Sequence, residues 1–259
     1  MRQTMITLQR LNHDTSWKIT INNSRLLLDP WLIGTEIDGF SWFNEQWHRV
    51  PPLGVEEIGE VDYIVVSQPF SDHCHEETIE VLSPDLPIVA VAAARKRLEK
   101  TFGQSRQFLD IPAAKDGFLE IAELRLAQFN TPSLLDQVHN ALLILGPDGE
   151  NIFYAPHGFV PNAQQISFLQ QFPIHILITT TSEYHLPFFL GGTVNLGMRS
   201  MQKLAQILQP KHIISTHDEQ KHAKGLVPRI ARTFYPSAAM VKEKLGNYVA
   251  VEDYRVVEL

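Results

Sequence analysis

The sequence predicts one layered α/β domain over residues 1–259. A β-rich beginning is followed, in both halves of the chain, by buried strands that alternate with amphipathic helices, and no internal repeat or low-complexity linker interrupts this order. The hydrophobic content of 44% and the charged content of 20% are typical of globular proteins that fold around a single core.

The first part of the chain is expected to form strands and a long loop. Residues 5–11 and 16–23 alternate in the strand period, 22–24 supply a turn, and the apolar run at 25–30 ends at a proline. Residues 34–60 have no clear period and are rich in aromatic side chains. A loop of this length either covers a binding site or is an irregular segment whose aromatic side chains pack onto the core.

The rest of the chain is expected to alternate between strands, in short buried apolar runs, and helices, in which apolar residues recur every three or four positions. Gly103 is expected to end one helix, and Pro-Asp-Gly separates the two strands of a hairpin at 141–155. A proline and a glycine bracket the helix at 236–246. The other strands are predicted at 61–67, 86–92, 106–109, 118–121, 123–130, 174–180, 212–217 and 247–252, and the other helices at 75–83, 93–103, 162–172 and 195–209.

Side chains that can bind a metal ion follow four of these strands. Loops at one rim of a sheet are where α/β proteins assemble their sites, and imidazole nitrogen and carboxylate oxygen are ligands of Zn²⁺. A single histidine at such a place is more often a surface or hydrogen-bonded residue, and Asp72 alone could cap a helix. The candidates are Asp72, His73 and His75 after the first strand, His157 after the second, His185 after the third and His217 after the fourth.

Two further residues of interest are His139 and Cys74. His139 lies at a strand entrance and could reach the same rim. Cys74, the only cysteine, lies between two histidines, and we expect an inert buried thiol, with a thiolate ligand as the alternative.

Composition excludes several partners. The net charge of −7 argues against binding to nucleic acid, and the basic run at 94–100 is typical of a solvated helix face. No run of eighteen apolar residues and no signal peptide are recognisable, so no membrane association is expected. A single cysteine suits a reducing compartment, which favours the cytoplasm. The expected partner is a small-molecule substrate or ligand, and no oligomeric state is predicted.

Four segments resemble one family. "SWKITINNSRLLLDPWL" resembles the first hairpin of the metallo-β-lactamase fold, in the branch of ascorbate-phosphate lactonases and related metal-dependent hydrolases. "VDYIVVSQPFSDHCH" corresponds to the strand and loop that carry His-x-His-x-Asp-His in that family. "NIFYAPHG" and "PKHIISTH" resemble its later strands. The resemblance covers nearly the whole chain and implies a four-layer αββα sandwich with the site along one edge.

The chain departs from the family pattern at the first metal position. Gln68 and Phe70 stand where the resemblance implies two histidine ligands, and His157 stands where it implies a bridging aspartate. A phenyl ring has no donor atom, an amide is a poor zinc ligand, and imidazole does not normally bridge two ions. The resemblance therefore implies one rebuilt site for one divalent ion, zinc or else manganese or iron. Its ligands would be Asp72, His73, His217 and His157, with His75 as a further ligand or an outer group.

Two functions follow from this site. The first is a metal-dependent hydrolase that activates water against an ester, lactone, amide or phosphoester, with Asp72 as a candidate orienting group and residues 34–60 as a cover. The second is a non-catalytic protein that binds a small ligand or a partner in the former active-site pocket. Gln68, Phe70 and His185 are the candidate pocket residues.

Overall fold

A computed structural model describes residues 5–132, 136 and 138–259. The chain divides into two compact units. The first unit comprises Met1–Pro112, Glu219–Pro228 and Glu252–Leu259, and the second comprises Ala113–Asp218 and Arg229–Val251. That the whole chain forms one domain stays a prediction.

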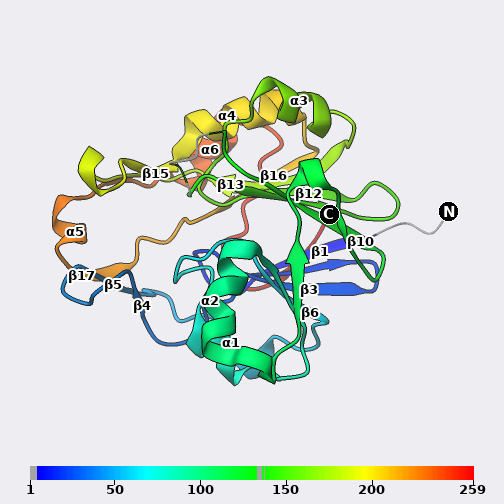
Figure 1. Cartoon of the computed structure of the whole chain (residues 1–259). Coiled ribbons are helices and arrows are strands. Elements are labelled where there is room, and N and C mark those ends of the chain that lie inside the picture. Colours follow the sequence, from blue (N-terminus) through cyan, green and yellow to red (C-terminus); the bar gives the residue numbers. More distant parts are fainter. Residues whose placement is uncertain (1–4, 133–135, 137) are drawn as a thin grey trace. The chain divides into compact units, whose positions relative to one another are not determined.

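The first unit is built on a seven-stranded sheet (Figure 1). Its antiparallel half has the order β19-β1-β2-β3, and β6, β7 and β8 continue it in parallel. The strands are β1 (Ile6–Arg10), β2 (Trp17–Ile21), β3 (Ser24–Leu28), β6 (Tyr63–Val66), β7 (Ile88–Val91), β8 (Phe108–Ile111) and β19 (Val256–Glu258).

Burial along these strands follows their sequence pattern. Burial alternates along β1 and β2, whereas every residue of β7 is buried, as expected for a parallel strand covered on both faces. Helix α1 (Glu76–Val81) follows β6, and α2 (Ala92–Phe102) packs along β7 and β8. The helix α2 ends at Gly103, whose φ of 52° is a conformation that glycine adopts without strain.

Residues 34–60 are more ordered than the sequence predicts. They contain β4 (Glu36–Ile37), β5 (Asn44–Trp47) and the 3₁₀ helix η1 (Val55–Glu57), and β5 pairs with both β4 and the distant β17 (His222–Gly225). Phe40 and Trp42 stack on one another and expose about two thirds of their surface. The interpretation that the aromatic side chains of this loop pack onto the core is therefore wrong for these two residues.

The second unit is built on a six-stranded sheet of order β16-β13-β12-β11-β10-β9. Strands β9 to β12 are antiparallel, and β12, β13 and β16 run in parallel, so the last three end at the same edge. The strands are β9 (Leu119–Ile121), β10 (Leu124–Phe129), β11 (Ala141–Leu145), β12 (Asn151–Ala155), β13 (Ile174–Thr180) and β16 (His212–Thr216).

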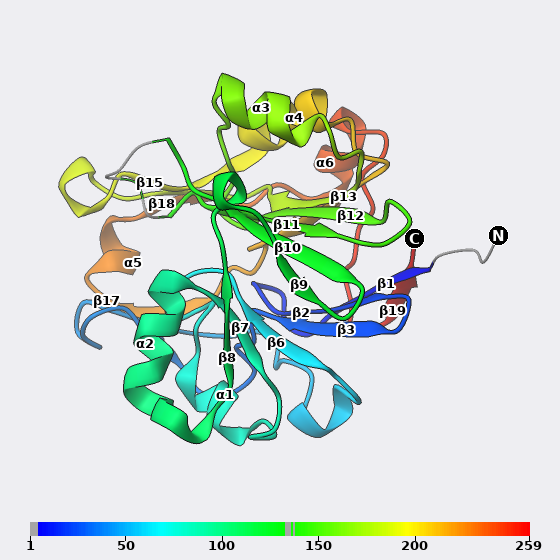
Figure 2. The same ribbon diagram turned by 45° about the vertical axis from the view of Figure 1, so that its right-hand side comes forward.

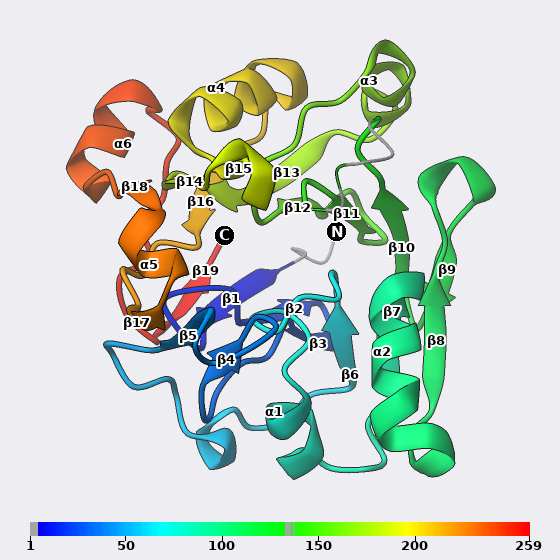
Figure 3. The same ribbon diagram turned by 60° about the vertical axis from the view of Figure 1, so that its left-hand side comes forward.

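Three helices, α3 (Ala163–Leu169), α4 (Gly197–Leu208) and α6 (Ala238–Lys244), lie on one face of this sheet (Figures 1, 2 and 3). The predicted amphipathic character of α4 is confirmed, because Met201, Leu204 and Leu208 are buried. They join an aromatic cluster in which Phe129, Phe153 and other rings meet edge to face. This cluster is the core of the second unit.

Most predicted elements are present, with three differences. The strand predicted at 247–252 is wrong: only Tyr248 forms an isolated bridge there, and the last strand is β19. The predicted strand at 106–109 lies slightly later, at β8. Several short elements were not predicted from the sequence, among them β14 (Glu183–His185), β15 (Thr193–Leu196), α5 (Val227–Ile230) and β18 (Arg232–Phe234), with η4 (Phe188–Leu190) between the first two.

Other short 3₁₀ turns are η2 (Gly103–Ser105) and η3 (Ala114–Asp116). Within the part of the chain that the structure describes, no helix has the length and apolar character needed to cross a membrane.

Candidate metal centre

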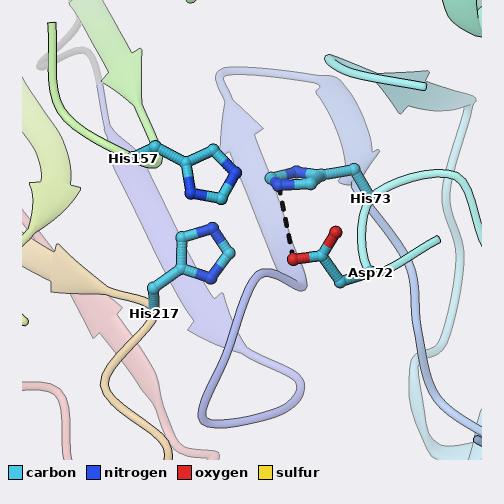
Figure 4. Close-up of side chains that lie close together, drawn as sticks. All are labelled: Asp72, His73, His157 and His217. Atoms are coloured by element: carbon cyan, nitrogen blue, oxygen red, sulfur yellow. Dashed lines mark ion pairs between the residues drawn. The ribbon is translucent and has the colours of Figure 1, made fainter. Parts of the chain in front are cut away.

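The first unit places Asp72 and His73 together just beyond the end of β6. The chain turns sharply there, because the backbone N–H groups of His73 and Cys74 both donate to the carbonyl oxygen of Phe70. The hydroxyl of Thr15 donates to the carbonyl oxygen of Asp72 at 2.7 Å and fixes the backbone of the turn. His73 Nε2 lies 3.6 Å from a carboxylate oxygen of Asp72 (Figure 4).

A second carboxylate orients the ring of His73 from its other side. Nδ1 of this fully buried ring donates to Asp29 at 2.7 Å. Asp29 also accepts hydrogen bonds from the backbone N–H and the hydroxyl of Ser67. A proton held on Nδ1 leaves the lone pair of the neutral ring on Nε2, the atom that faces Asp72.

The charge state of His73 follows from these neighbours. Burial lowers the pKa of His73, but the carboxylates of Asp72 and Asp29 outweigh burial and raise this pKa to about 9. In the absence of another cation the ring is therefore an imidazolium between two carboxylates at neutral pH. A metal ion that binds Nε2 must displace this proton.

The second unit places His157 and His217 together, past the ends of the parallel strands β12 and β16. Their rings stack with centroids 4.4 Å apart (Figure 4). His157 Nδ1 donates to the amide oxygen of Asn195 at 2.7 Å, which puts the lone pair of the neutral ring on Nε2. The amide nitrogen of Asn195 donates to Ser182, whose hydroxyl donates to the carbonyl oxygen of His217. One hydrogen-bonded chain thus holds both histidines.

The other predicted ligand, His75, has both ring nitrogens engaged within the first unit. Its Nδ1 accepts from the backbone N–H and the hydroxyl of Thr78 and so caps α1, and its Nε2 lies 3.3 Å from the carbonyl oxygen of Thr35. These bonds assign His75 to the helix cap, and we leave it out of the ligand set proposed below.

The predicted pocket residues lie in different surroundings. Gln68 is buried and Phe70 is half-buried, both in the turn after β6. His185 is partly exposed on β14, where it contacts the side chains of Thr193 and Glu183. His139, for which the sequence suggests no partner, has its Nδ1 2.7 Å from the carboxylate of Asp136.

Three further features near the predicted site residues were not predicted from the sequence: Asp29, Asn195 and a buried ion pair. Asp29 was detectable, because it follows a buried strand in the same way as the histidines do. Asn195 has no such signal, since β15 is short and was not predicted.

The third missed group is a buried ion pair, in which Lys221 Nζ lies 2.8 Å from Asp14 and 3.5 Å from Glu36. Burial raises the pKa of Glu36 well above its ordinary value, against the opposing effect of Lys221 and with added repulsion from Asp72. Asp14, whose carboxylate lies closer to Nζ than that of Glu36, is the main ionic partner of Lys221.

The prediction of a buried thiol at Cys74 is confirmed. Burial raises the pKa of Cys74 to about 12 from an ordinary value of 9.0. The thiolate fraction at pH 8 should then be on the order of 1,000-fold lower than in the unfolded chain. We expect iodoacetamide to modify Cys74 slowly in the native protein and rapidly in urea, as followed by mass spectrometry. Rapid native labelling would contradict this prediction.

Residues 8–217 match the profile of the beta-lactamase superfamily domain. This match covers most of the chain and includes Asp72, His73, His157 and His217, and the protein therefore belongs to the beta-lactamase superfamily. Among curated proteins, no sequence matches the chain.

Solved structures show the same fold. A "possible metal-dependent hydrolase" of Veillonella parvula has a TM-score of 0.72 at 17% identity, over 98% of this chain and 100% of that one. The isothiocyanate hydrolase of Delia radicum gut bacteria has a TM-score of 0.68 at 17% identity, over 97% and 98%. The metallo-beta-lactamase fold protein YhfI of Bacillus subtilis has a TM-score of 0.63 at 11% identity, over 99% and 100%. The predicted metallo-β-lactamase fold is confirmed.

Proposed function

We propose that this protein is a metal-dependent hydrolase in which Asp72, His73, His157 and His217 bind one divalent ion. The proposal is carried by the way two buried histidines are prepared as ligands. His73 and His157 each have Nδ1 fixed by a hydrogen-bond acceptor, the arrangement that normally accompanies imidazoles that bind metal through Nε2.

The donor set suits a divalent ion. Each of the four side chains is buried and offers one ligand atom, which makes three imidazole nitrogens and one carboxylate oxygen. This is a common set for zinc, and manganese or iron also accept it. Phe70 has no donor atom and Gln68 has only an amide, so a second ion in the same turn is not supported by the chemistry of these residues.

A bound ion of this kind would polarise the electrophilic group of a substrate and make a water molecule more acidic. The chain's own residues have the supporting roles. Asp29 and Asn195 hold the rings of His73 and His157 in one orientation. Asp72 is the candidate for orienting the attacking water. We propose an ester, lactone, amide or phosphoester as substrate; the hydrolysis of an isothiocyanate by a protein of the same fold is also an attack of water on an electrophilic carbon.

Elemental analysis of protein prepared with metal in excess tests the proposal. We expect about one transition-metal ion per chain, and hydrolysis of at least one activated ester, lactone or phosphodiester that stops on chelation and returns on addition of the metal. Protein free of metal after such a preparation would overturn the proposal. A ligand bound with chelator-insensitive affinity would then favour the non-catalytic alternative.

The orienting role of Asp29 predicts a loss of metal affinity in Asp29→Asn. The amide cannot provide the same charged acceptor to both Ser67 and His73, and loss of such an outer contact costs about 10- to 100-fold in metal affinity. Competition with a chromophoric chelator measures this. The matched control is Asp62→Asn, which removes a carboxylate on the same unit that pairs with Arg25, and we expect no change in metal affinity. Equal affinities of the two variants would contradict the role of Asp29.

A further inference from the structure

His217 has a backbone conformation that costs free energy. Its φ of 55° lies in the left-handed region, which is strained for a residue with a Cβ and persists only where the surroundings enforce it. Ser182 restrains its carbonyl oxygen from one side. The carboxylate of the next residue, Asp218, accepts from the hydroxyls of Ser215 and Thr181. These contacts fix the chain before and at His217 within the second unit.

The restraint after His217 comes from Glu219, which is buried in the first unit. One carboxylate oxygen accepts from the backbone N–H groups of Arg49 at 2.5 Å and Val50 at 3.2 Å, and the other lies 2.5 Å from His48 Nδ1. Three donors therefore meet one carboxylate. Only Asp218 separates Glu219 from His217, and consecutive Cα atoms are about 3.8 Å apart, so the chain has little slack between the two.

The partner of Glu219 is itself held firmly. The ring of His48 lies against Trp31 with centroids 3.9 Å apart, and its Nε2 is 3.2 Å from the carbonyl oxygen of Trp31. Beyond Glu219, Lys221 is paired with Asp14. The strand β17 then pairs residue by residue with β5. The segment 219–225 is thus attached to residues 44–50 along its length, and Glu219 is the attachment nearest to His217.

We propose that Glu219 is a positioning residue for the metal centre: it fixes the direction in which the chain leaves His217 and so holds the imidazole ready to bind the ion. The inference rests on the proposed function, since it assumes that His217 is a ligand. Glu219 itself binds no metal and touches no substrate in this role. Its contribution is to keep the strained backbone of His217 in place when the ion is absent, so that binding does not have to order it.

The variant Glu219→Gln tests the proposal with little change in shape. In the wild type both carboxylate oxygens of Glu219 accept hydrogen bonds. In the variant one of these oxygens is replaced by an NH₂ group, which cannot accept, so at least one of the three hydrogen bonds is lost. We expect metal affinity, measured by chelator competition, to fall about 10- to 100-fold. X-ray absorption of the zinc-loaded protein should then show one imidazole fewer. The matched control is Glu45→Gln, which breaks the ion pair between Lys224 on β17 and Glu45 on β5. For this variant we expect wild-type metal affinity and the wild-type number of imidazole ligands.

A second variant keeps the test decisive if Glu219→Gln does not fold. His48→Gln places an amide nitrogen near the former Nε2 and removes only the Nδ1 donor to Glu219, leaving both backbone bonds in place. A fall in affinity with loss of one imidazole supports the proposal. Unchanged affinity and ligand count in the folded variants overturn it while leaving the hydrolase proposal intact. Wild-type protein that binds no metal overturns the proposed function itself, and the two failures are therefore distinguishable.

Discussion

Replacing both His73 and His217 with alanine is expected to reduce bound metal from about one ion per chain to none and to abolish metal-dependent hydrolysis. The two residues supply two of the three imidazoles in the proposed ligand set, and the remaining pair, Asp72 and His157, is too few for tight binding of zinc. In the wild type, free metal at 100 times its Kd should stabilise the folded protein by about 2.7 kcal/mol, and in the double variant this increment should vanish.

Thermal unfolding with and without metal, paired with elemental analysis, measures both effects. The matched control is His175→Ala with His212→Ala, a second pair of neighbouring histidine rings in the second unit whose centroids are 5.6 Å apart. Neither His175 nor His212 belongs to the proposed ligand set, so their loss should leave metal content and metal-induced stabilisation unchanged. Metal retained by the first variant, or lost equally by the control, would contradict the proposed ligands.

The largest loss of stability is expected for Lys221→Met. Its ammonium pairs with Asp14, which is almost completely buried, and also lies near Glu36. Removal of one partner leaves a buried carboxylate without its ion pair, which typically costs about 3–5 kcal/mol of folding free energy. Urea denaturation at pH 7 measures it. We expect Lys224→Met, which removes an ion-pair partner whose own side chain is 59% exposed, to cost no more than about 1 kcal/mol.

The pH dependence of this contribution has a defined sign. Burial lowers the pKa of Lys221, but Asp14 and Glu36 outweigh burial and raise it well above the ordinary value of 10.5. A raised pKa means that the lysine's stabilising effect is fully present below pH 10.5 and is lost as the pH rises through the folded-state value. At pH 7 the whole effect is therefore measured. Adding Asp14→Asn to Lys221→Met should recover much of the loss, because it removes the orphaned charge. No recovery would mean that the cost came from packing around Trp31, over whose ring the ammonium also lies.

The amino-acid sequence alone determined the local elements and the kind of chemistry available. The strand period predicts β1, β2 and β6, the helical period predicts α2 and α4, and Asp72, His73, His157 and His217 follow strands that the structure confirms. These predictions succeed because a strand or helix of ordinary length is decided by its own apolar pattern, and because a residue just past a buried strand must emerge at the edge of its sheet.

Only the tertiary structure decided which side chains meet. Asp29 reaches His73 across 44 positions of the chain and Lys221 reaches Asp14 across 207, and no period in the sequence records such a distance. The strands β5 and β17 are four residues each and find one another only after the chain has folded. His75 looks like a ligand in the sequence and caps a helix in the structure. Donor and acceptor partners are chosen by geometry in three dimensions, and the free energy of burying a charge is set by neighbours that the local sequence does not contain.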